Sequence, residues 1–146
     1  MFSRDIEQNS FFNFRTKQIR PTKKDDGRSS MESLFDHLTC KASETSEGNR
    51  QRNVFEMARS VRLHWIRYHI EEKKQANIEI FSSEDRINGK TVIRTYIFDV
   101  VQNYVIILEP QRSGLDYYLI TAYHLDMEYG KKQILKKHKK KLDAIY

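Results

Sequence analysis

Hydrophobic positions recur at helical spacing in three parts of the chain. The stretch 53–75 lacks Gly and Pro and carries apolar stripes on two faces, which predicts a helix covered from two sides, or two helices bent near Ser60. Residues 127–143 form a second helical pattern whose remaining positions are almost all lysine. A short helix is expected near 31–40, where apolar residues recur at intervals of three and four.

Between the two longer helices the pattern changes to that of β-strands. Strands are expected at 77–81, 91–100, 104–109 and 117–125, and the Asn-Gly pair at 88–89 predicts a hairpin. The run at 104–109 is continuously apolar, which is typical of a central strand. Turns this short join antiparallel neighbours. The expected fold class is therefore α+β: N-terminal helices, then a four-stranded antiparallel β-meander, then a C-terminal lysine-rich helix.

The chain of 146 residues suits one main domain with an extension. Residues 20–30 combine Pro, Gly, Ser and mixed charge, which indicates a flexible link, and 41–49 again lacks a hydrophobic pattern. We therefore expect residues 1–49 to form a partly flexible N-terminal extension that includes the short helix. Residues 50–146 then form the main domain.

The net charge of +6 is concentrated at the two ends of the chain. Residues 1–28 contain seven Lys/Arg against four Asp/Glu, and residues 127–146 contain seven Lys against two acids, whereas the part between them is slightly acidic. Clustered cations release counterions from polyanions, so nucleic acid is the expected partner. The alternative is that the lysines only keep a helix face soluble.

Several classes of protein are excluded by composition. No stretch approaches the roughly 18 apolar residues of a membrane span, and the first fifteen residues carry charges where a signal peptide is apolar. A single cysteine, Cys40, suits a reducing compartment, so we expect a cytoplasmic protein with no membrane partner. Neither a metal-binding spacing nor a glycine-rich phosphate loop occurs, and we expect no cofactor and no metal.

Polar side chains embedded in apolar strands are the candidates for chemistry. Metal-free RNA cleavage needs groups that move protons and cations that stabilise the phosphorane. The candidate catalytic residues are Arg94, Thr121, Tyr123, His64 and Arg112. Taken singly, each has a purely structural alternative, since polar and aromatic residues are common in strands and on helix surfaces.

Further residues are candidates for holding the RNA. These are Arg67, Tyr96, Lys131, Lys132 and Lys136. The lysines would contact the phosphate backbone, and an aromatic ring such as that of Tyr96 or Tyr118 would stack on an unpaired base.

Three segments together resemble a known group of domains: RSVRLHWIRYHIE, IRTYIFDVVQNYVIILE and DYYLITAYHLD. They look like phage-linked and toxin-associated domains that are grouped with the barnase, EndoU, colicin and RelE-like (BECR) ribonucleases. The resemblance covers about residues 50–146. It implies a small metal-independent endoribonuclease with its site on the concave sheet face, in which Arg94, Thr121 and Tyr123 are polar members. His64 and Arg67 are not implied by the resemblance.

The leading hypothesis is thus a toxin-type ribonuclease, bacterial or phage-encoded, that cleaves RNA by attack of the 2′-hydroxyl. Single-stranded loops such as those of tRNA are the candidate substrate. A toxic nuclease also implies an inhibitory antitoxin or immunity protein, and a basic site favours an acidic one. The alternative is a non-catalytic nucleic-acid-binding protein or a phage accessory protein that keeps a nuclease-like fold.

Overall fold

A computed structural model gives the fold. The parts of the chain that it describes are residues 13–15, 17–21, 30–44, 50–55, 62–112, 114–125 and 128–146. In chain order the elements are β1 (Asn13–Phe14), β2 (Lys17–Pro21), α1 (Ser30–Thr39), β3 (Cys40–Glu44), β4 (Arg50–Phe55), α3 (Leu63–Ile70), β5 (Ile78–Ile87), β6 (Lys90–Asp99), β7 (Tyr104–Pro110), β8 (Asp116–His124) and α4 (Glu128–Lys139).

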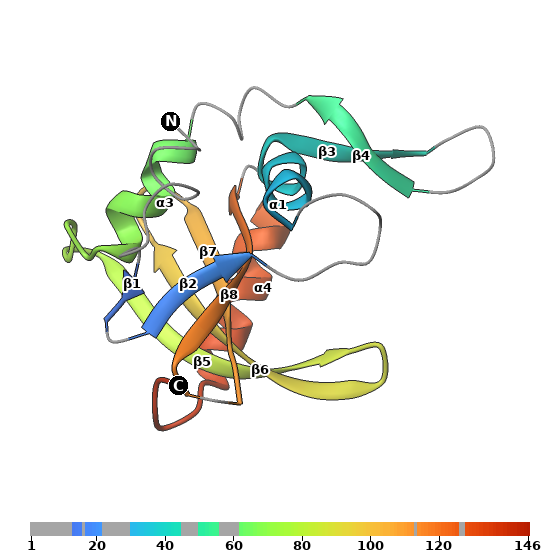
Figure 1. The fold of residues 1–146 in the computed structure, drawn as a ribbon. Coiled ribbons are helices and arrows are strands. Elements are labelled where there is room, and N and C mark those ends of the chain that lie inside the picture. The colour runs from blue at the N-terminus through green and yellow to red at the C-terminus, as the bar shows by residue number, and fades with distance from the viewer. Residues whose placement is uncertain are drawn as a thin grey trace.

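A six-stranded sheet in the order β1-β2-β8-β7-β6-β5 organises the molecule (Figure 1). β2 runs parallel to β8, and the other neighbouring strands are antiparallel. β3 and β4 pair separately as a two-stranded antiparallel sheet, which extends away from the larger one in Figure 1. The sheet is therefore mixed, and its strands come from both halves of the chain.

The predicted fold class is wrong in two respects. The sheet is six-stranded and mixed rather than a four-stranded antiparallel meander, because β1 and β2 continue it beyond β8. The long helix expected at 53–75 is also replaced: β4 ends at Phe55, and α3 covers only Leu63–Ile70. In β4, pairing with β3 overrides the local helical periodicity. In the larger sheet, β2 covers the edge that β8 would otherwise leave open. The bend expected near Ser60 falls outside the described residues.

The predictions from local sequence patterns were more reliable than the predicted fold class. The helix expected near 31–40 is confirmed as α1, and the apolar run at 104–109 is confirmed as the central strand β7, which is buried from Tyr104 to Leu108. The Asn-Gly hairpin is also confirmed. Asn88 and Gly89 both have positive φ, at 49° and 77°, as a two-residue type I′ turn between β5 and β6 requires.

Alternating side chains give the sheet two covered faces. One face packs against α1 and α3 through a cluster that includes Ile97, Ile106 and Ile66. The opposite face packs against α4 through Phe81, Tyr96 and other residues around Ile134 of the helix. Phe14, Ile19, Leu34 and Leu38, which precede residue 50, belong to the first cluster.

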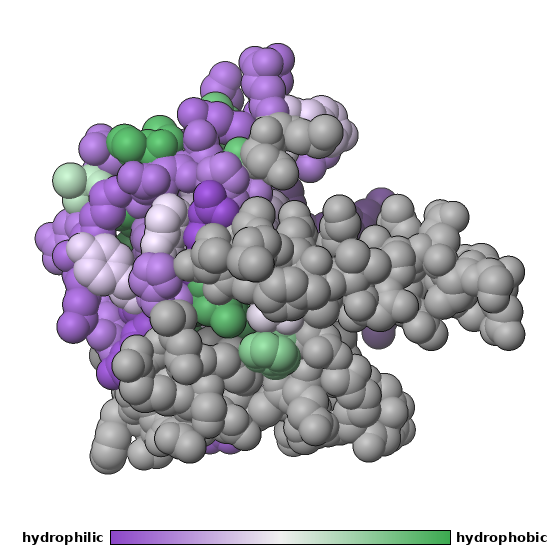
Figure 2. Space-filling model, turned by 90° about the horizontal axis from the view of Figure 1, so that it is seen from above, coloured by the Kyte–Doolittle hydropathy of each residue, from purple (hydrophilic) through white to green (hydrophobic). Residues whose placement is uncertain are grey.

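Most of the residues that Figure 2 colours by hydropathy are hydrophilic, and the coloured hydrophobic side chains form small separate areas. None of the helices in the described ranges is both long and apolar enough to cross a membrane.

Candidate functional site

A row of four polar residues crosses the sheet on the α4 face. Ser83 of β5 pairs in register with Arg94 of β6, and Glu109 of β7 pairs with Tyr118 of β8. Arg94 and Glu109 continue the β6–β7 register one residue beyond Thr95 and Leu108. Directly opposed residues share one sheet face, so the row Ser83–Arg94–Glu109–Tyr118 is continuous.

Arg94 and Glu109 form the charged centre of this row. Nε of Arg94 lies 3.7 Å from Oε2 of Glu109, and the side chains are 18% and 29% exposed. At that distance the contact is an ion pair rather than a hydrogen bond, and the buried Nε has no hydrogen-bond partner in the described part of the chain. The guanidinium therefore has a buried, unsatisfied Nε donor next to a partly exposed carboxylate.

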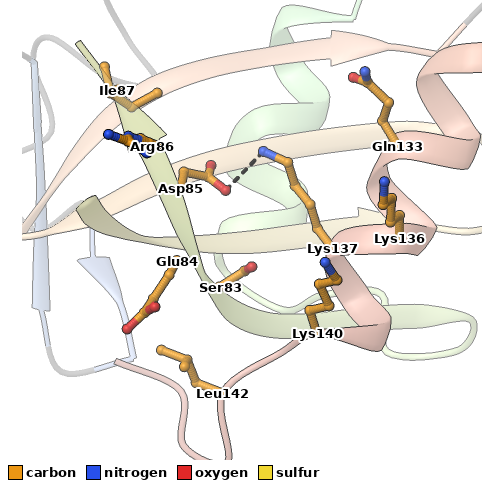
Figure 3. A pocket seen from close by; sticks show the side chains of 10 residues that line it. All are labelled: Ser83, Glu84, Asp85, Arg86, Ile87, Gln133, Lys136, Lys137, Lys140 and Leu142. Atoms are coloured by element: carbon orange, nitrogen blue, oxygen red, sulfur yellow. Dashed lines mark hydrogen bonds and ion pairs between the residues drawn. The ribbon is translucent and has the colours of Figure 1, made fainter. Parts of the chain in front are cut away.

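Two hollows are lined in part by members of the row. The first, of about 550 Å³, lies between β5 and α4 and is lined by Ser83 and Asp85 on one side and by lysines of α4 on the other (Figure 3). The second, of about 860 Å³, is lined by Glu109, Tyr118 and Arg112, among others. Ser83, which opposes Arg94, therefore connects the row to the first hollow, and Glu109 connects it to the second.

A second polar cluster lies beside the row and joins β5, β6 and α4. Nζ of Lys137 is 2.9 Å from Oδ1 of Asp85 and 2.9 Å from the hydroxyl of Tyr96, which donates a hydrogen bond to the other oxygen of Asp85. Burial, and then the neighbouring Asp85 carboxylate, raise the pKa of Tyr96 far above the usual range of a phenol. Tyr96 is thus a neutral donor. Its buried ring stacks on Phe81, with centroids 5.0 Å apart.

Thr121 and Tyr123 lie on the same sheet face as Arg94. Thr121 opposes Ile107 and is buried, and Tyr123 opposes Val105 and packs against the cluster beneath α4. Ile107 in turn opposes Tyr96, so an apolar side chain separates Thr121 from Tyr96. Of the residues implied by the resemblance, Arg94 is the one that belongs to the polar row.

His64 and Arg67 lie across the sheet from this row. Both are on α3, which packs into the opposite cluster through Ile66 and Ile70. His64 is exposed, with an edge contact to Trp65, and Nε of Arg67 forms an ion pair of 2.6 Å with Glu71. The structure therefore does not bring these two residues together with Arg94.

The remaining predicted residues are divided between the two hollows and the surface of α4. Arg112 is exposed in the turn after β7 and lines the second hollow, and Lys136 lines the first. Lys131 is half-buried and lines neither of these hollows, and exposed Lys132 forms a 3.2 Å ion pair with Glu128.

Sequence reasoning missed Glu109 and Ser83. Glu109 ends the apolar run of β7, and a charged residue at that position was a usable signal once β6 and β7 were taken as antiparallel neighbours. Ser83 carried no such signal, because a single serine in a strand is unremarkable.

An ionic cluster on the opposite face was also missed. Asp99 is fully buried and accepts hydrogen bonds from His69 Nε2 at 2.9 Å, Lys74 Nζ at 2.8 Å and the backbone N–H of Gln102 at 3.0 Å. His69 Nδ1 faces the Trp65 carbonyl oxygen at 2.7 Å, so both ring nitrogens face acceptors. Although burial favours the neutral acid, the hydrogen bonds from Lys74, Gln102 and His69 outweigh it and lower the pKa of Asp99.

Within the described ranges, no three His, Cys, Asp or Glu residues are grouped so that they could hold a metal ion. Comparisons with protein-family models, with curated proteins and with solved structures found no match. The resemblance to BECR ribonucleases therefore stays a prediction.

Proposed function

We propose that the protein is an endoribonuclease that cleaves RNA without a metal ion, at the row Ser83–Arg94–Glu109–Tyr118. The observation that carries the proposal is the Arg94–Glu109 pair. The Arg94 guanidinium, whose buried Nε lacks a hydrogen-bond partner among the described residues, stands 3.7 Å from the Glu109 carboxylate, and the two side chains are 18% and 29% exposed. A base beside a cation is what transfer from a 2′-hydroxyl to phosphorus requires.

The proposed reaction divides the roles among the row. The Glu109 carboxylate takes the proton of the 2′-hydroxyl as its oxygen bonds to phosphorus. Arg94 donates hydrogen bonds to the phosphorane oxygens, where negative charge accumulates. The bond from phosphorus to the 5′ oxygen breaks, and that oxygen takes a proton from the Tyr118 hydroxyl. The products are a 2′,3′-cyclic phosphate and a 5′-hydroxyl.

The other expected residues have supporting roles or none in this proposal. Arg112 lines the hollow next to Glu109 and would contact a neighbouring phosphate. Thr121 and Tyr123 support the sheet beneath α4, and His64 lies across the sheet from the reaction.

A toxin-type role in the cytoplasm of a bacterium, for a chromosomal or phage-encoded protein, remains part of the proposal. An inhibitor that blocks the surface of α4 and the two hollows would need acidic side chains to match the lysines there.

A second candidate function is nucleic-acid binding without cleavage. The observation that favours it is the burial of Tyr96 and Thr121, two of the residues expected in a site, which are only 1% and 9% exposed. Lysines on α4 hold a phosphate backbone equally well without a reaction.

Incubation of purified protein with tRNA and total RNA in the presence of EDTA tests the proposal. We expect cleavage with 2′,3′-cyclic phosphate ends, located by mapping 3′ termini. Glu109→Gln should lower kcat by about 10²–10⁴-fold, and Arg94→Ala by about 10²–10³-fold.

The matched control is Glu72→Gln, which removes a carboxylate whose ion pair with Arg15 lies away from the row. It should cleave like the wild type. Intact RNA with the wild-type protein, together with tight salt-dependent binding, would reject catalysis and leave the binding function.

A further inference from the structure

One face of α4 carries a line of residues that border the first hollow. Gln133, Lys136, Lys137 and Lys140 line it, and Tyr129 lies one turn before Gln133. Residues three or four apart share a helix face, so these five side chains form one stripe. Figure 3 shows the lysines of this stripe on the opposite side of the hollow from β5.

The hollow has more cations than its own carboxylates neutralise. Asp85 is neutralised by Lys137 at 2.9 Å. The side chains of Lys136 and Lys140 have no ion pair or hydrogen bond with any described residue. Glu84 and Arg86 alternate with Asp85 along β5 and point away from α4 in Figure 3. Two unpaired cations at the wall of a hollow of about 550 Å³ form a site for anions, and phosphate groups are the natural class.

Tyr129 adds an aromatic surface at the end of this stripe. Its side chain is 71% exposed, and its hydroxyl accepts a hydrogen bond of 2.7 Å from Nε2 of Gln133. The hydrogen bond holds the ring next to Gln133, which lines the hollow, and leaves most of the ring exposed. Exposed rings next to cations are what proteins use to stack the bases of single strands.

We propose that the groove between β5 and α4 binds a single strand of RNA, with phosphates at Lys136 and Lys140 and a base stacked on Tyr129. The inference rests on the proposed function in taking RNA as the ligand. The hollow has room for one or two nucleotides but not for a double helix, and only unpaired bases can stack on a side chain. At the other side of the groove, Ser83 leads to Arg94, so the bound strand would continue into the reacting row.

The groove also changes which lysines of α4 are expected to contact RNA. Of the three lysines expected to hold RNA, only Lys136 lines it, while Lys132 is engaged with Glu128. Lys140 and Tyr129 were not expected. The specific prediction is therefore that the position of a lysine on α4, and not only its charge, decides its contribution.

Fluorescence anisotropy with a labelled 2′-O-methyl RNA of about eight nucleotides tests this. The probe has no free 2′-hydroxyl, so binding is measured without cleavage. The double variant Lys136→Gln/Lys140→Gln should bind about tenfold more weakly, and the slope of log K against log salt should fall by about 1.4, the value for two phosphate contacts on a single strand. Lys132→Gln/Lys139→Gln removes the same charge from the same helix outside the groove. It should weaken binding by no more than about twofold.

Tyr129 separates stacking from charge. Tyr129→Ala should weaken binding about tenfold with an unchanged salt slope, and Tyr129→Phe should bind like the wild type, because a phenyl ring also stacks. Thermal melting of each variant identifies any loss of folding, which the exposed positions make unexpected.

Each other outcome overturns the inference. Equal weakening by the two lysine pairs would mean that the charge acts without a defined site. Normal binding by Tyr129→Ala would remove the stacked base, and a polyglutamate peptide that binds with the same dependence on Lys136 and Lys140 would assign the groove to an acidic protein. Cleavage of unmodified RNA is scored separately, so the reaction can fail while the groove stands, and the reverse.

Discussion

Two buried aspartates, Asp85 and Asp99, lie on opposite faces of the sheet and have similar partners. Each binds a lysine, and each accepts one hydrogen bond from a ring group, Tyr96 in one case and His69 in the other. They differ in what surrounds them. The partners use both oxygens of each carboxylate, but Asp99 is fully enclosed, whereas Asp85 opens through Lys137 onto a groove lined by the unpaired side chains of Lys136 and Lys140.

The difference separates a structural ion cluster from a candidate binding site. A saturated buried cluster has no donor left for a ligand, so it can only contribute to stability and to the position of α3. In a cluster at the wall of an open groove, the aspartate pairs with one lysine, and the neighbouring lysines remain available to a ligand. The comparison therefore predicts that changes at Asp99 act on stability and that changes around Asp85 act on binding.

The largest expected effect is the loss of stability in Asp99→Asn. The change leaves Lys74 and His69 facing an uncharged amide in a buried place, which should lower the free energy of unfolding by about 3–5 kcal/mol. Asp85→Asn should cost only about 1–2 kcal/mol, because Lys137 is 38% exposed and regains water. Urea denaturation measures both values. Equal costs would contradict the distinction between the two faces.

Acid should remove the stabilisation that the ionised Asp99 carboxylate gives to the fold, within a defined range of pH. Its pKa is lower in the folded protein than the unfolded value of about 3.9, so the carboxylate stabilises the fold fully above that pH. The stabilisation is then lost as the pH falls through the folded pKa. The difference in unfolding free energy between wild type and Asp99→Asn should be constant from about pH 5 to 7 and shrink below about pH 4. A difference that grows in acid would contradict the assignment.

Whether the sequence could predict a feature depends on how far apart along the chain the residues that form it lie. The Asn88-Gly89 turn and the helix α1 are local, and they followed from spacing and turn chemistry. β2 was missed because a single buried apolar residue, Ile19, stands between polar neighbours, and its partner strand begins at Asp116. That parallel pairing is a property of the whole chain, which no local pattern contains.

The candidate site likewise contains residues that a local pattern reveals and partners that only the fold brings together. Arg94 was recognisable as a cation inside an apolar strand, but its partner Glu109 required the β6–β7 register. His69 and Asp99 are thirty residues apart and join elements of different type, so neither spacing nor composition connects them. Tyr96 was expected to stack on a base, and only packing shows its ring to be buried against Phe81.

Tyr96→Phe tests whether a buried residue on the α4 face contributes to stability without contributing to RNA binding. It removes the hydroxyl that donates to Asp85, which should lower the unfolding free energy by about 1–2 kcal/mol. Lys137 still neutralises Asp85, so the affinity for the 2′-O-methyl RNA should not change. Urea denaturation and anisotropy measure the two quantities. Weaker RNA binding at unchanged stability would mean that Tyr96 contacts the ligand after all.

The smallest expected effect is that of Lys132→Gln on stability. Lys132 and Glu128 form an exposed i,i+4 pair with side chains 70% and 81% exposed, and such pairs contribute about 0.3–0.5 kcal/mol. The variant should therefore unfold within about 0.5 kcal/mol of the wild type, and the difference should vanish in high salt. Thermal or urea denaturation at two salt concentrations measures this. A larger cost would show that the surface of α4 outside the groove also contributes to stability. Large effects on stability would then not be confined to the enclosed face at Asp99, and the contrast with the open face at Asp85 would fail.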